Sequence, residues 1–139
     1  MGAQHSINKI NYEDVQYAIK NNYLIINTMG ENEQDLLIIK TIIASREVEV
    51  INSLLKSSMK DKNIVIYGKN TNDDKLMTKY QQLISLGFTN VYIYCGGLFE
   101  WLLLQDIYGE EEFPTTKKEL DIIKYKPGKL FNIMYLTSV

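Results

Sequence analysis

The one cysteine of the chain, Cys95, is the residue whose side chain could do covalent chemistry, because a thiolate is a strong nucleophile. It follows an apolar run and precedes the pair Gly96 and Gly97. A cysteine at the end of a buried strand is ordinarily packed and inert, so we expect Cys95 to be structural. A catalytic thiol at this position is the alternative that the sequence leaves open.

A second place for chemistry is the polar stretch after the apolar run Ile64–Tyr67, which predicts a loop between a buried strand and a helix. Its residues are Gly68, Lys69, Asn70, Thr71, Asn72 and Asp73. Such a loop turns backbone N–H groups and the positive end of a helix dipole toward its occupant, which favours an anion such as a thiolate. No thiol stands there, and the charges of Asp73 and Asp74 oppose a second anion. We expect a solvated turn with Asn72 capping the next helix; anion binding through Lys69 is the alternative.

Composition excludes several classes of function. A chain of 139 residues has room for one domain. A formal net charge of -2, without a clustered basic face, excludes nucleic acid as an obligate partner. One cysteine and one histidine exclude an internal disulfide and a zinc site of Cys and His, and we expect no metal and no cofactor. This cysteine usage is consistent with a reducing, cytoplasmic compartment.

The first six residues, 1–6, fit the M-G-x-x-x-[ST] pattern for N-myristoylation of Gly2 once Met1 is removed. An unmodified tail is the alternative. A single myristoyl chain binds membranes only weakly, at roughly 10⁴ M⁻¹, and the nearest basic residue is Lys9. Lipid attachment would therefore give weak contact with the cytoplasmic face of a host or viral membrane, in a eukaryote or a virus replicating in one. No apolar run reaches the roughly 18 residues that span a bilayer.

The apolar pattern predicts strands that alternate with helices. This is typical of an α/β domain with an open, mostly parallel sheet of about five strands and helices on both faces. Strands are expected at 23–27, 64–67 and 91–94, and helices at 11–20, 47–56, 74–86 and 98–107. Residues 36–43 form either a short strand or an irregular apolar segment. The helix at 47–56 is expected to bury Val48, Ile51, Leu54 and Leu55, and Gly87 is expected to end the helix at 74–86.

The chain is expected to divide into three segments. Residues 1–9 form a flexible tail, 10–108 the folded domain, and 109–139 a C-terminal extension that packs on or near the domain. The apolar stretch at 130–136 is either a last strand or a surface segment. We expect Tyr108 and Phe113, beside acidic residues, to be exposed and to form an interaction surface.

The segment from Leu86 to Trp101 carries a resemblance to a known family. It reads L-G-F-T-N-V-Y-I-Y-C-G-G-L-F-E-W. This block resembles the last core unit of the rhodanese (sulfurtransferase) family, which has L-G-F-x-x-V, a strand, and G-G-x-x-x-W. In that unit Gly96 and Gly97 would permit a tight turn from strand to helix, and Trp101 would close over the core. The resemblance covers residues 10–108 and implies a single rhodanese-like domain.

Active members of the family carry C-x-x-x-x-R in the loop after the central strand. Their cysteine takes a sulfane sulfur as a persulfide, and their arginine fixes the loop or the substrate. Here Gly68 stands at the cysteine position and Asp73 at the arginine position. Asn27-Thr28-Met29 replaces Asp-x-Arg, and residues 40–45 (K-T-I-I-A-S) fall where G-H-I-P-G-A is expected. The resemblance therefore implies a catalytically degenerate member.

Together these patterns predict a non-catalytic binding or scaffold module with an unidentified protein partner, held weakly at a membrane through a lipid on Gly2. An enzyme is the first alternative: a divergent thiosulfate or persulfide sulfurtransferase that works through Cys95. A structural component of a virion-type assembly is the second.

Overall fold

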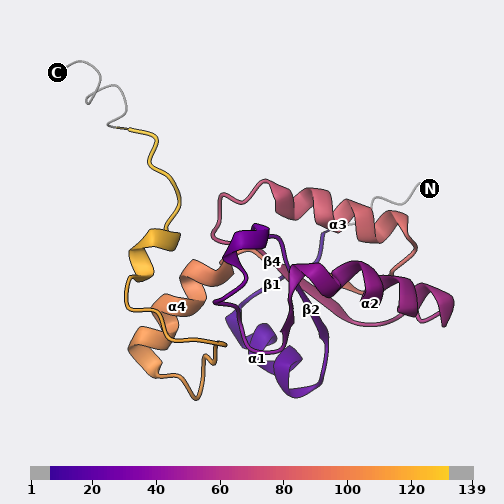
Figure 1. The fold of residues 1–139 in the computed structure, drawn as a ribbon, viewed down its shortest axis with the longest axis horizontal. Coiled ribbons are helices and arrows are strands. Elements are labelled where there is room, and N and C mark those ends of the chain that lie inside the picture. Colours follow the sequence, from indigo (N-terminus) through magenta and orange to yellow (C-terminus); the bar gives the residue numbers. More distant parts are fainter. Residues whose placement is uncertain (1–6, 132–139) are drawn as a thin grey trace.

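The computed structural model describes residues 7–131 and has a parallel sheet at its centre (Figure 1). The sheet has five strands in the order β1-β5-β4-β2-β3, and every pair is parallel. The strands are β1 (Lys9–Ile10), β2 (Leu24–Asn27), β3 (Thr41–Ile42), β4 (Ile64–Tyr67) and β5 (Val91–Tyr94). The helices are α1 (Tyr12–Lys20), α2 (Ala44–Lys56), α3 (Lys75–Ser85) and α4 (Gly97–Tyr108), with short 3-10 helices η1 (Glu31–Glu33) and η2 (Ile122–Tyr125). The predicted α/β class and parallel sheet are confirmed.

The two faces of the sheet have separate cores. Val65 and Tyr67 of β4 contribute to the core formed with α1 and α4. Ile64 and Ile66 contribute to the core formed with α2 and α3, which lie together on one side in Figure 1. Successive side chains of a strand point to opposite faces, so a strand covered on both faces must be apolar throughout. This is why β4 reads as a continuous apolar run.

Local sequence signals set several helix ends. At the start of α1, the Asp14 N–H donates to the Asn11 side chain (3.0 Å) and the Asn11 N–H donates to the Asp14 carboxylate (3.1 Å). This reciprocal pair satisfies N–H groups that have no partner within the helix. Gly87 follows α3 with a φ of +100°, a conformation that glycine adopts at little cost. It ends the helix as predicted.

Three expectations about order and burial are wrong. Lys9 lies in β1 and pairs with Ile93, so the expected tail over 1–9 includes part of the sheet. Val48 is 70% exposed, because the buried stripe of α2 is narrow and centres on Ile51. Phe113 is only 3% exposed, because its ring packs against Trp101 at a centroid distance of 5.0 Å. The ring of Tyr12 also packs against Phe113, at a centroid distance of 5.6 Å, and a contact between residues so far apart along the chain leaves no local sequence signal.

The ambiguous segment at 36–43 contains both of the predicted forms. Leu36, Leu37 and Ile38 are buried without forming a regular strand, and Thr41 and Ile42 form β3. Residues 113–116 of the C-terminal segment lie alongside it: the Ile39 N–H donates to the Pro114 carbonyl (3.1 Å) and the Thr116 N–H donates to the Leu37 carbonyl (2.9 Å). The irregular segment thereby finds backbone partners outside the sheet.

Two predictions fall outside the described part of the chain. Gly2 and most of the apolar stretch 130–136 lie beyond residues 7–131. Within that range, no helix is both long enough and apolar enough to cross a membrane.

The turn between β5 and α4 packs directly on the loop between β4 and α3. Gly97 has a φ of +70°, and a Cβ atom there would lie 2.7 Å from the Gly68 carbonyl oxygen. The Leu98 N–H donates to that same oxygen, and the Phe99 N–H donates to the Lys69 carbonyl, both at 2.9 Å. The first turn of α4 therefore holds the loop in place, and Gly97 is required for the close approach of the two backbones.

Replacing Gly97 with alanine tests this close approach. We expect Gly97→Ala to lower the free energy of unfolding by about 2–5 kcal/mol, because strain at positive φ adds to overlap with backbone atoms. Gly109→Ala is the matched control, since Gly109 has a φ of +101° but nothing within 4 Å of its Cβ position. It should lose only the strain of its own backbone conformation (φ +101°, ψ +164°), about 1–3 kcal/mol. Urea unfolding measures both, and equal losses would contradict the packing described.

Candidate functional site

The loop between β4 and α3 lies at the carboxyl ends of the parallel strands, where ligand sites of open α/β sheets are found. Gly68 begins the loop and is buried. The adjacent strand β2 ends at Asn27, and the Thr28 N–H that follows donates to the Tyr67 carbonyl (3.0 Å). Residues after β2 and after β4 therefore meet at one place, which is where the sequence predicted the site.

The side chain of Asp73 folds back over Gly68. A Cβ atom built on Gly68 would lie 2.6 Å from Cγ and 2.8 Å from Cβ of Asp73, far closer than unbonded carbon atoms approach. The carboxylate thus fills the space where any side chain at position 68 would begin. The two residues that the resemblance matches to the family's cysteine and arginine are in direct contact.

Three donors hold the Asp73 carboxylate in this place. The Thr28 hydroxyl donates to Oδ2 at 2.6 Å, and the Lys69 N–H donates to the same oxygen at 3.3 Å. The Lys75 N–H, at the first residue of α3, donates to Oδ1 at 2.9 Å. The expectation that Asn72 caps this helix is wrong, because Asp73 supplies the acceptor. A carboxylate at a helix N-terminus is also favoured by the helix dipole.

Two other backbone donors of the loop are used within the loop. The Asn72 N–H donates to the Asn70 side-chain oxygen (2.9 Å), and the Asp73 N–H donates to the Asn70 carbonyl (3.4 Å). Thr71 and Asn72 have exposed side chains, whereas Asn70 is buried. The N–H groups of residues 69, 72, 73 and 75 are therefore engaged with acceptors of the loop itself. They do not converge on an outside anion.

A neutral network replaces the charge pair expected at the end of β2. Asn27 is buried, and its Nδ2 donates to Gln34 Oε1 (3.0 Å) and to the Ile42 carbonyl (3.2 Å). Its Oδ1 accepts from the Met29 N–H (3.0 Å). Gln34 Oε1 also accepts from the Ala44 N–H at the start of α2 (2.9 Å). Sequence reasoning missed Gln34, since no spacing rule relates it to these partners.

Cys95 follows Tyr94, which pairs with Tyr67 in the sheet, so its backbone lies next to the start of the loop at Gly68. Its half-buried side chain packs against the core beneath α2 and α3. A cavity of about 220 Å³ opens at the loop and is lined by Thr28, Lys69, Asp73 and their neighbours, but not by Cys95. The sole thiol therefore packs against the core and does not line the cavity at the loop.

Two buried tyrosines beneath the site act as structural hydrogen-bonding groups. Burial raises the pKa of Tyr67, although bonds with Thr41 and the Ile38 N–H oppose that shift. Burial also raises the pKa of Tyr94, and its bond to Glu100 (2.6 Å) adds to this effect. Both hydroxyls stay protonated at neutral pH, so neither serves as a general base.

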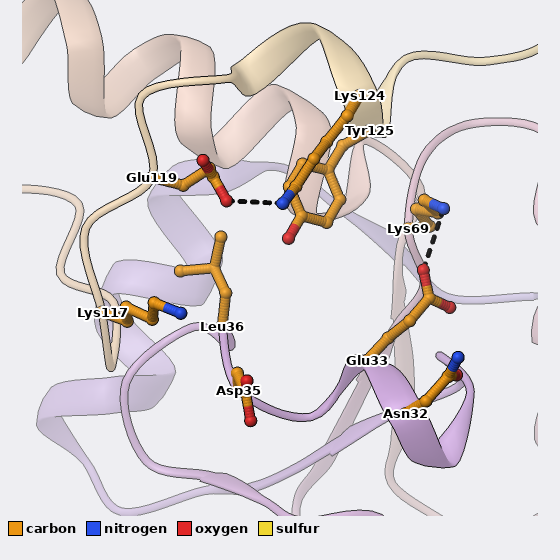
Figure 2. A pocket seen from close by; sticks show the side chains of 9 residues that line it. All are labelled: Asn32, Glu33, Asp35, Leu36, Lys69, Lys117, Glu119, Lys124 and Tyr125. Carbon is orange, nitrogen blue, oxygen red and sulfur yellow. Dashed lines mark hydrogen bonds and ion pairs between the residues drawn. The ribbon is translucent and has the colours of Figure 1, made fainter.

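The C-terminal segment supplies one wall of a second cavity, of about 350 Å³, beside Lys69 (Figure 2). Asn70 Nδ2 donates to the Tyr125 carbonyl (2.9 Å), which ties the loop to η2. Lys69 pairs with Glu33 (2.9 Å), and this hydrogen bond lowers the pKa of the Glu33 carboxyl. Tyr125 was not singled out from the sequence, because its contacts join segments far apart in the chain.

Metal-binding geometry is not found in the part of the chain that the structure describes. Among residues 7–131, no three His, Cys, Asp or Glu side chains lie close enough together to hold an ion. The acidic residues 110–112 form no such cluster. The candidate site consists of the sealed loop at Gly68 and the polar cavity next to it.

Comparison with solved structures shows the same fold. A crystal structure of the Alr3790 protein from Anabaena sp. has 19% identity and a TM-score of 0.55, and the match covers 83% of this chain and 86% of that chain. The solution structure of the rhodanese-like domain of that protein has 20% identity and a TM-score of 0.55, with coverage of 90% and 88%. The BH2092 protein from Bacillus halodurans has 18% identity and a TM-score of 0.56, with coverage of 95% and 90%.

Comparison of the sequence gives the family. No curated protein sequence matches the chain. The family model of the rhodanese-like domain matches residues 19–104, more than half of the chain and including both the β4–α3 loop and the β5–α4 turn. The chain belongs to the rhodanese-like domain family.

Proposed function

We propose that this protein is a non-catalytic member of the family that acts as a binding or scaffold module. The observation that carries the proposal is the Asp73 carboxylate over Gly68, at the position where active members of the family carry a thiol. Gly68 has no side chain, so the loop has no nucleophile at its base.

The chemistry of the loop supports this proposal. A carboxylate accepts hydrogen bonds but does not form the persulfide that sulfur transfer requires. The Asp73 carboxylate and thiosulfate are both negatively charged, so the two repel each other. The Lys69 and Lys75 N–H groups, which an anion would need, already donate to Asp73. The Asp73 side chain therefore repels the substrate, offers no nucleophile in place of a thiol, and occupies two backbone donors.

An assay of thiosulfate-to-cyanide sulfur transfer tests the proposal. The wild-type protein and Cys95→Ser are expected to give the same rate as buffer alone, because the one thiol packs against the core and does not line the cavity at the loop. An active rhodanese measured in parallel validates the assay. Trapping with an alkylating reagent and mass spectrometry should find no sulfane sulfur on Cys95. Turnover by the wild type that Cys95→Ser abolishes would overturn the proposal.

Lipid attachment at Gly2 belongs to the same proposal, on the strength of the M-G-x-x-x-[ST] pattern. Co-expression with an N-myristoyltransferase is expected to add one myristoyl group to the wild-type chain and none to Gly2→Ala. Intact mass spectrometry reads this directly. The lipidated protein should cosediment only weakly with neutral vesicles, as a single chain allows. A wild-type mass without the lipid would contradict the prediction.

A further inference from the structure

The cavity beside Lys69 has the size of a small-molecule site. Its volume of about 350 Å³ falls in the range for such sites, roughly 300–1,000 Å³. Its lining comes from η1 and the residues after it, from Lys69, and from residues 117–125 (Figure 2). The buried Leu36 contributes its one aliphatic side chain, and the other lining side chains are polar, charged or aromatic. Such a lining suits a polar ligand.

Tyr125 presents an unpartnered hydroxyl to this cavity. The residue is 8% exposed, and its carbonyl accepts from Asn70. The ammonium groups of Lys69 and Lys124 lie 5.8 and 5.4 Å from the ring centroid. The hydroxyl points toward the space above Leu36 in Figure 2, and none of the hydrogen bonds among residues 7–131 uses it. The ring is held in place, and its hydroxyl opens to the cavity, so it can donate to a ligand that enters there.

The charges around the cavity leave one unpaired group of each sign. Lys69 pairs with Glu33 at 2.9 Å, and Lys124 pairs with Glu119 at 2.7 Å. Two further lining side chains, Lys117 and Asp35, form no ion pair within residues 7–131. Lys117 borders one side of the cavity in Figure 2. Leu36 lies between Tyr125 and Asp35 in this view.

We propose that this cavity binds a small zwitterion of the free amino-acid class. Its carboxylate would accept from the Tyr125 hydroxyl and meet the Lys117 ammonium, and its own ammonium would meet Asp35. Three carboxylates and three ammonium groups line the cavity, so its charges balance, which favours a zwitterion over a dianion such as phosphate. This inference rests on the proposed function as a binding module. The two proposals are tested separately: the sulfur-transfer assay reports on the Gly68 loop, and ligand titration reports on the cavity.

Titration of the full-length, ¹⁵N-labelled protein tests this assignment. Each of the twenty free amino acids is added at millimolar concentration, with acetate, methylammonium and inorganic phosphate as separate arms. At least one amino acid is expected to give saturable shifts in the amide signals of Asp35, Lys117 and Tyr125. Acetate and methylammonium should each bind more weakly than that amino acid. Absence of saturable shifts with any amino acid, or tighter binding of phosphate, would overturn the proposal.

Three variants separate the ligand contacts from the fold. Tyr125→Phe keeps the ring and removes the hydroxyl, and it should weaken binding about fivefold with an unchanged unfolding midpoint. Lys117→Gln should weaken binding at least as much. Lys118→Gln is the matched control, because Lys118 pairs with Glu110 and does not line this cavity. Equal affinity in Tyr125→Phe and wild type, or equal loss in Lys118→Gln, would contradict the assignment.

Discussion

The contact between the Asp73 carboxylate and Gly68 determines the structure of the whole site. The carboxylate can lie there only because position 68 has no side chain. Once there, it joins three elements: it accepts from Thr28 after β2, from Lys69 in the loop and from Lys75 at the start of α3. A half-buried carboxylate with three donors is a strong local constraint, since hydrogen bonds to a charged group are stronger than those between neutral groups.

The same loop is fixed from its other side by α4 and by the C-terminal segment. Its first two carbonyls accept from Leu98 and Phe99, and its buried Asn70 donates to Tyr125. The loop is therefore bonded on each side to its own chain. The family's fold is kept, and the loop at the carboxyl end of β4 serves as a junction between elements.

Sequence reasoning predicted what depends on local patterns. The continuous apolar runs predicted β2, β4 and β5, since strands covered on both faces need them, and Gly87 predicted the end of α3. The loop of the site was also located, from the residues that follow β4. The occupant of the loop could not be predicted, because the choice between Asn72 and Asp73 as acceptor depends on Thr28. Phe113 and Tyr125 were missed or misplaced for the same reason: their partners are distant in sequence.

A double-mutant cycle between positions 68 and 73 tests most directly whether the carboxylate occupies the space over Gly68. In the wild-type background, Gly68→Ala is predicted to lower the free energy of unfolding by about 1–3 kcal/mol, because the methyl group meets Asp73. In the Asp73→Gly background, which also removes the Asp73 Cβ that would lie 2.8 Å away, the same substitution should cost less than about 0.5 kcal/mol. Urea unfolding of the four proteins gives the coupling. An equal cost of Gly68→Ala in both backgrounds would show that Asp73 does not fill this space.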